Sequence, residues 1–157
     1  MKIMKRSAIW VLLFLVVSSN AFGGAWGIGY FQNDTALDFW SDLKEQHGGI
    51  TGLMVPIQKV IRAENSYLNA DYCNTAIAAA ALIASMKDDS MADLPPEGIE
   101  WVRTHRKLYE AKMATDAVSA LEKIVEGSEL KELWRESPDY KKWMALIQQL
   151  LQRLKTT

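Results

Sequence analysis

The sequence has little of the residue types that crosslink a chain, bind a transition metal or act as nucleophiles. It has one cysteine, Cys73, and two histidines, His47 and His105. One cysteine cannot form an intramolecular disulfide, and its place beside an apolar run indicates a small buried side chain and not a reactive thiol. Neither histidine has another ligand type at chelating spacing, so zinc is not expected. No serine lies in a glycine-flanked elbow, so we expect no Ser-His-Asp or Cys-His catalytic device.

Long apolar runs are also scarce. The longest, residues 8–17, has ten residues, whereas a membrane-spanning helix needs about twenty. Basic residues precede this run, and Ser19-Asn20-Ala21 follows it with small residues at the positions that a signal peptidase reads. The pattern predicts a signal peptide at residues 1–21 with cleavage before Phe22, or alternatively after Gly23. Residues 22–157 are then expected to form one domain that is exported, either to the periplasm or as a secreted protein.

The sequence has no large excess of charge of either sign. It contains 18 basic and 19 acidic residues, for a net charge of −1. Three of the basic residues, Lys2, Lys5 and Arg6, belong to the predicted signal peptide, so 15 basic residues remain against 19 acidic ones and the mature chain carries about −4. This charge argues against nucleic acid or an acidic membrane as the partner, and we expect neither.

Apolar residues recur at three- and four-residue steps along most of the mature chain, which predicts helices almost throughout. Asn33 or Asp34 is placed to cap a first helix that runs to about Gln46. A loop over Gly49–Gly52 is expected next. A short helix should follow it, with Pro56 in the first turn, where proline is tolerated.

The second half of the chain continues the helical pattern. The apolar stretch 76–84 contains six alanines and predicts a central helix, because small side chains let neighbouring helices approach closely. Residues 87–97 are expected to form an exposed loop. Helical spacing resumes over 114–127, Ser128 can cap a short helix through Trp134, and an apolar stripe over 140–154 predicts the last helix. The sequence therefore predicts an all-α fold, a single compact bundle of about five to seven helices.

Three separated motifs carry a resemblance to a known family. They are Gly24-Ala25-Trp26-Gly27, then Asn33-Asp34 with Asp38, and finally Ser128-Glu129-Leu130-Lys131-Glu132-Leu133-Trp134. In this order, with the alanine-rich helix between them, they resemble a family of small bacterial proteins, domain of unknown function 4259. The likeness covers nearly all of the mature chain. The family has no established activity, so the resemblance implies no substrate. Its members often have a glutamate where this chain has Ala81, so no acidic site is expected at that position.

We interpret the motif residues as structural. Glycines before a helix can cradle a phosphate, but the carboxylates of Asp34 and Asp38 would repel one. We expect instead an apolar arm that inserts Trp26 and Phe31 into a groove. The residues to which we assign structural roles are Gly24, Trp26, Gly27, Asn33, Asp34, Asp38, Ser128, Glu129, Leu130 and Trp134.

Acidic residues form two groups. Asp34, Asp38 and Asp42 are spaced by four, so their carboxylates line one helix face and are the candidate site for a hard cation. The helix dipole favours acidic residues in a first turn without any metal, and we prefer that interpretation. The second group surrounds Trp134 and alternates with basic residues, which indicates a solvated face with local ion pairs; it consists of Glu129, Glu132 and Glu136 with Lys131 and Arg135.

One basic patch and two function hypotheses remain. The patch, made of Arg103, Arg106 and Lys107, is expected to be a surface stripe or half of a partner interface. The favoured hypothesis is a non-enzymatic protein-binding module of the cell envelope, of inhibitor or immunity type, without catalytic residues, cofactor or metal. The alternative is a small metal-dependent envelope hydrolase that uses Asp34 and Asp38, together with Glu64. A polar pocket in which those carboxylates converge would distinguish it.

Overall fold

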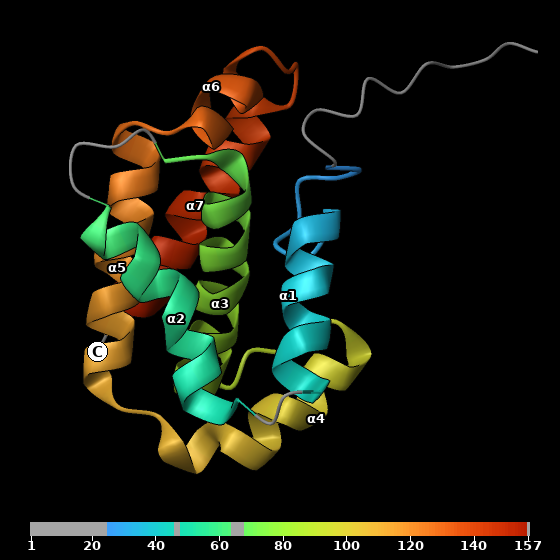
Figure 1. Ribbon diagram of the computed structural model, residues 1–157, viewed down its shortest axis with the longest axis vertical. Helices are drawn as coiled ribbons and strands as arrows, with labels where there is room; N and C mark the ends of the chain where they lie inside the picture. The colour runs from blue at the N-terminus through green and yellow to red at the C-terminus, as the bar shows by residue number, and fades with distance from the viewer. Residues whose placement is uncertain (1–24, 46–47, 64–67, 157) are drawn as a thin grey trace, which may run out of the picture.

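The computed structural model describes residues 25–45, 48–63 and 68–156. The predicted signal peptide, its cleavage sites, Gly24, His47 and Glu64 lie outside these residues. The described chain forms seven α-helices and one short 3-10 helix, and within it no strand is present, so the all-α prediction is confirmed (Figure 1). The elements are α1 (Asp34–Glu45), α2 (Gly49–Arg62), α3 (Ala70–Asp88), α4 (Pro96–His105), the 3-10 helix η1 (Arg106–Leu108), α5 (Ala111–Glu126), α6 (Glu129–Arg135) and α7 (Tyr140–Lys155).

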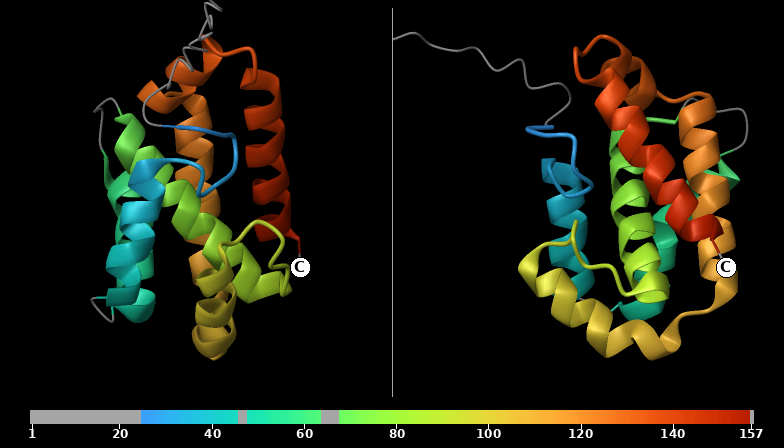
Figure 2. Two further views of the ribbon diagram at one scale, coloured as in Figure 1. Left: turned by 90° about the vertical axis from the view of Figure 1, so that its right-hand side faces the viewer. Right: turned by 180° about the vertical axis from the view of Figure 1, so that it is seen from behind.

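Helix α3 is the centre of the bundle. It packs against α1, α2, α4, α5, α6 and α7, and the left view of Figure 2 shows α1 and α7 on opposite sides of it. Every residue from Ala76 to Met86 is buried, whichever way its side chain points. Alanine allows this because it adds little width to the helix, so neighbours can approach closely on all sides. The predicted central helix is confirmed.

Helix α2 differs from the sequence-based prediction. It begins at Gly49 and includes the expected 49–52 loop, and Pro56 lies inside the helix and not in its first turn. Burial explains the difference, because Leu53 and Ile57 are completely buried on its inner face and this outweighs the low helix propensity of glycine. A helical proline normally clashes with the carbonyl four residues earlier. That residue is Gly52, which has no side chain to add to the crowding.

The segment between α3 and α5 also differs from the prediction. The expected loop over 87–97 is shorter, because α3 continues to Asp88 and α4 begins at Pro96. Helix α4 itself was not predicted. It buries Trp101 and Val102, and Trp101 packs edge-on against Trp40 of α1 with the ring centroids 6.3 Å apart. Two buried apolar side chains in ten residues are a weak periodic signal, so long-range packing defines this helix better than its sequence does.

Candidate functional site

The Gly-Ala-Trp-Gly motif enters α1 through a closed loop. Ala25 and Asn33 form an isolated antiparallel bridge, and the Trp26 N–H donates to the Gln32 carbonyl at 3.1 Å. The Ala36 N–H donates to Asn33 Oδ1 at 2.8 Å, so the cap predicted at Asn33 or Asp34 falls on Asn33. A Cβ on Gly27 would lie 2.1 Å from Oε1 of Gln32. The Gln32 side chain therefore lies so close to the backbone at position 27 that only glycine fits there without a shift.

The prediction that Trp26 inserts into a groove is wrong. Its side chain is 61% exposed, whereas Tyr30 and Phe31 are buried in the core. The apolar side chains that hold this loop to the bundle are Tyr30 and Phe31, with Ala25 and Ile28 partly buried against the core. The Tyr30 hydroxyl also donates to the Leu146 carbonyl on α7 at 3.2 Å.

The Ser128–Trp134 motif organises the start of α3 as well as α6. The Lys131 N–H donates to Ser128 Oγ at 3.1 Å, so Ser128 caps α6 as predicted. The Ala70 N–H donates to Oε2 of Glu129 at 2.8 Å, and the Glu129 N–H donates to the Leu68 carbonyl at 2.8 Å. Glu129 therefore supplies an acceptor to the first turn of α3 and does not belong to a solvated face.

Trp134 of this motif and the cysteine Cys73 are buried in the core. Trp134 is 8% exposed and stacks on Trp143 of α7, with ring centroids 5.8 Å apart. Cys73 is buried, as predicted, and burial raises the pKa of its thiol to about 12. A thiol with so high a pKa is protonated at neutral pH and is a poor nucleophile.

The acidic and basic candidates lie on the surface. Asp34, Asp38 and Asp42 are all exposed on α1. Among the described residues, no group of three or more His, Cys, Asp or Glu is placed to hold a metal. Since Glu64 is outside those residues, the hydrolase hypothesis stays a prediction. In the second acidic group, Glu132 and Arg135 form the expected local ion pair at 2.9 Å.

The basic patch is partly neutralised by a neighbouring acidic residue. Arg106 pairs with Asp89 at 2.7 Å, while Arg103 and Lys107 are exposed. His105 stacks on Trp101, with ring centroids 4.1 Å apart and planes 9° from parallel. The imidazole is therefore engaged by a ring of its own helix.

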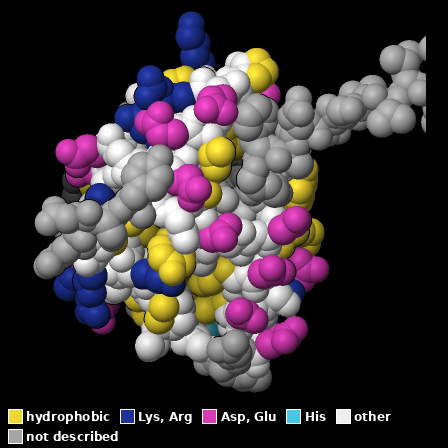
Figure 3. Space-filling model, turned by 45° about the horizontal axis from the view of Figure 1, so that its top comes forward, with side chains coloured by type: hydrophobic (Ala, Val, Ile, Leu, Met, Phe, Trp, Pro, Cys, Tyr) yellow, Lys and Arg dark blue, Asp and Glu magenta, His cyan; other side chains and the backbone are white. Residues whose placement is uncertain are grey.

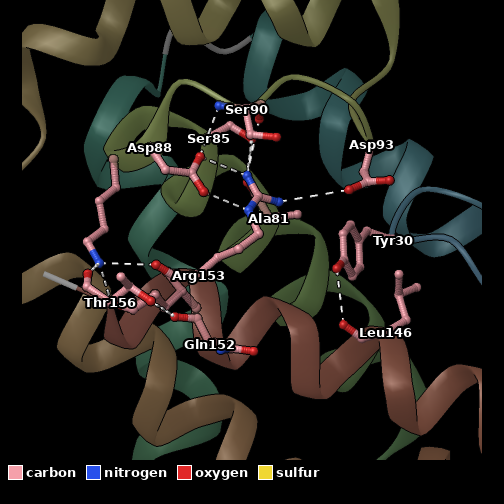
Figure 4. A network of polar contacts seen from close by, with 12 residues as sticks. Tyr30, Ala81, Ser85, Asp88, Ser90, Asp93, Leu146, Gln152, Arg153 and Thr156 are labelled. Carbon is pink, nitrogen blue, oxygen red and sulfur yellow. Dashed lines mark hydrogen bonds and ion pairs between the residues drawn. The ribbon is translucent and has the colours of Figure 1, made fainter.

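A polar network joins the end of α3 to α7 (Figure 4). Arg153 donates from Nε and Nη2 to the two carboxylate oxygens of Asp88, at 2.8 and 3.0 Å. Burial alone would raise the pKa of Asp88, but the Arg153 hydrogen bond, the Ser90 N–H and the Arg153 charge together hold it below its ordinary value. Nearby, burial and the charge of Asp93 raise the pKa of Tyr30 to about 12, although Arg153 opposes this. The hydrogen bonds and ion pair between Asp88 and Arg153 thus connect α3 to α7, and we call this pair the clasp.

An apolar groove lies between α1 and α2. Two adjoining cavities of about 180 and 170 Å³ share Phe39, Gly52 and Val55 as lining residues. Figure 3 shows apolar side chains in the hollow with acidic side chains beside it. The first cavity is completed by Pro56, Lys59, Tyr72 and Thr75, and the second by Asp42, Leu43 and Gly48. We call this surface the α1–α2 groove.

Exposed apolar side chains mark the groove as incompletely covered. Val55 is 60% exposed and Tyr72 is 41% exposed. The Lys59 ammonium lies 3.3 Å from the centroid of the Tyr72 ring, which forms one end of the groove. This site could not be predicted from the sequence, because its residues come from three helices. One signal was present in the sequence: α2 carries Met54 and Val55 outside the buried stripe, so it is apolar on more than its inner face.

Comparison with known proteins identifies the family. The family model described as "Domain of unknown function (DUF4259)" matches residues 24–145. Searches of curated proteins and of solved structures found no match. In the part of the chain that the structure describes, no helix has both the length and the apolar character needed to cross a membrane. The matched residues make up most of the 157-residue chain, so the protein belongs to the DUF4259 family.

Proposed function

We propose that this member of the DUF4259 family is an exported, non-enzymatic protein-binding module of the cell envelope, of inhibitor or immunity type, and that it binds its partner in the α1–α2 groove. The observation that carries the proposal is the groove itself, in which Val55 is 60% exposed beside cavities of about 180 and 170 Å³. An apolar hollow with a polar rim is typical of protein-interaction sites.

The chemistry of the groove favours binding over catalysis. Its lining is mainly Phe39, Val55, Pro56 and Tyr72, with one carboxylate, Asp42, and one ammonium, Lys59. The ammonium is already engaged by the Tyr72 ring. An enzyme site needs an acid, a base or a nucleophile held within reach of one reacting atom, whereas a docking site needs apolar area and shape.

Export is supported by the sequence pattern of residues 1–21 and is tested by mass. Intact-mass spectrometry of the protein from its native host should show loss of the first 21 residues. The same spectrum after Ala21→Arg should show retention of the leader, because Ala21 is the last residue before the first cleavage site and the third residue before the second, and a signal peptidase reads both positions. A full-length mass for the unmodified chain in the membrane fraction would contradict export.

Binding is tested by photocrosslinking in the native envelope. A photoreactive amino acid at Val55 should yield one discrete crosslinked protein, because that side chain lines the groove and is 60% exposed. The matched control has the photoreactive amino acid in place of Ser119, which is exposed on α5. The crosslink at Val55 should be absent at Ser119 and should disappear when Phe39→Glu places a charge in the groove. Equal crosslinking at the two positions, or none at either, would argue against the proposed function.

A further inference from the structure

We infer that the occupant of the α1–α2 groove is a basic amphipathic helix of about three turns, whose apolar residues enter the two cavities and whose Lys or Arg side chains lie over α1. This inference rests on the proposed function, because it names the occupant of the same groove.

The size of the groove fits the side chains of a helix. Each cavity, at about 180 and 170 Å³, is close in volume to one known to admit a benzene ring, roughly 150 Å³. Two cavities that adjoin at Phe39 and Val55 suit two large apolar side chains, one turn apart at i and i+3 or i+4. The lining residues along α2 run from Gly48 to Lys59, a distance of about 16 Å at 1.5 Å per residue, which is room for about three turns.

The negative charges on α1, along one rim of the groove, favour a basic partner. Asp38 and Asp42 are exposed one turn apart, and Asp42 is itself a lining residue of the groove. Asp34 continues this row toward the start of α1. Acidic side chains lie beside the apolar hollow in Figure 3, so cationic side chains flanking a docked helix would meet carboxylates there.

The positively charged side chains around the groove do not neutralise the negative charge of the α1 rim. The Lys44 ammonium lies 5.3 Å from the centroid of the Trp40 ring, and Lys59 is on the opposite rim, over Tyr72. Arg62 is exposed in the last turn of α2. The flank of the occupant that lies over α2 is therefore expected to be neutral or acidic, and only the flank over α1 basic.

Two other occupants fit these charges less well. A second copy docked by a two-fold axis would bring two acidic α1 rims into one interface, and like charges there oppose association. An anionic lipid surface would meet the same carboxylates and be repelled. The charge of a basic segment from another chain, in contrast, complements this rim.

The test uses three labelled peptides with one apolar stripe and different flanks. Each has about 16 residues with Leu at i, i+4 and i+7, and the flank carries Lys, Gln or Glu. Binding to the purified mature protein is measured by fluorescence anisotropy. The Lys peptide should bind about five- to tenfold more tightly than the Gln peptide, and the Glu peptide more weakly still. This order should fade when the salt concentration rises from about 0.05 to 0.5 M.

Variants of the protein test whether the preference for the Lys peptide arises in the groove. Asp38→Asn with Asp42→Asn should bring the affinity for the Lys peptide down to that for the Gln peptide. The matched control, Glu126→Gln with Glu136→Gln, removes two exposed carboxylates outside the groove and should leave the order unchanged. Val55→Glu should weaken the binding of all three peptides at least tenfold, because it places a charge where the apolar stripe of the peptide docks.

The outcomes separate this inference from the proposed function. Equal binding of the three peptides, lost in Val55→Glu, would overturn the basic occupant and leave the groove as a docking site. No binding of the Lys peptide, with a crosslink at Val55 retained in the envelope, would also overturn the basic helix and not the proposed function. Loss of both the peptide binding and the crosslink would overturn both.

Discussion

At the scale of single residues, the two motif tryptophans have opposite environments. Trp134 is 8% exposed and stacks on Trp143, whereas Trp26 is 61% exposed. Trp134→Ala should therefore lower the free energy of unfolding by roughly 3 to 5 kcal/mol, and Trp26→Ala by no more than about 0.5 kcal/mol. Urea unfolding followed by circular dichroism measures both. Equal losses in the two variants would show that Trp26 packs against the protein in solution.

A single left-handed residue ends α3. Asp89 has φ +63°, a conformation that costs most residues roughly 1 to 2 kcal/mol and glycine almost nothing. Asp89→Gly should raise the free energy of unfolding by about 0.5 to 1 kcal/mol, after the greater freedom of glycine in the unfolded chain is subtracted.

The ion pair of Asp89 with Arg106 is lost in that variant, so it needs its own control. Both side chains are largely exposed, and such a pair contributes roughly 0 to 1 kcal/mol. Arg106→Ala removes the pair and keeps the backbone conformation, so it should change stability very little. Thermal unfolding of the two variants separates the effects. A lower melting temperature for Asp89→Gly than for the wild type would contradict the backbone argument.

At the scale of helices, the predictable elements are those whose burial is visible in their own sequence. The alanine run of α3 and the apolar stripe of α7 predict buried helices locally. Ser128 and Asn33 are recognisable caps because a capping residue acts within three positions. Helix α4 and the glycine-rich start of α2 were missed, since both depend on partners distant in sequence. Trp101 needs Trp40, and Leu53 needs the core, before a helix there becomes favourable.

The clasp between α3 and α7 should make stability depend on pH. The pKa of Asp88 is lower in the folded protein than its ordinary value, so the ionised carboxylate stabilises the fold. This contribution is complete above the unfolded pKa of about 3.9 and is lost as the pH falls through the lower folded pKa. The difference in free energy of unfolding between wild type and Asp88→Asn should therefore be constant from about pH 7 to 5 and shrink toward pH 2.

A double-mutant cycle provides the control for that measurement. Asp88→Asn and Arg153→Gln, alone and together, isolate the coupling between the two side chains. The coupling should decrease over the same acidic range, because protonation of Asp88 removes its charge. A coupling that stays constant from pH 7 to 2 would mean that packing, and not charge, holds α7 to α3.

At the scale of the whole molecule, the fold class was predictable and the groove was not. Helical periodicity is a local property, and it was sufficient for an all-α bundle. The groove depends on how far α1 lies from α2 and on what lies beneath them. Phe39, Val55 and Thr75 belong to three helices and meet only in the folded protein. The acidic row on α1 was visible in the sequence, but without the apolar hollow beside it the row indicated only a helix dipole or a cation site.

The arrangement of the bundle also predicts that a residue of the groove can be replaced with little change in the free energy of unfolding. Val55 and Leu53 are two residues apart on α2, yet Val55 is 60% exposed and Leu53 is completely buried. Val55→Glu should change the free energy of unfolding by no more than about 0.5 kcal/mol, because glutamate is a good helix former and little buried apolar area is lost. Leu53→Ala should lower it by about 2 to 5 kcal/mol through the cavity it leaves. Chemical denaturation of both variants measures the contrast. A loss above about 2 kcal/mol in Val55→Glu would mean that Val55 belongs to the core, and the groove would then be a defect of packing and not a surface kept open for a partner.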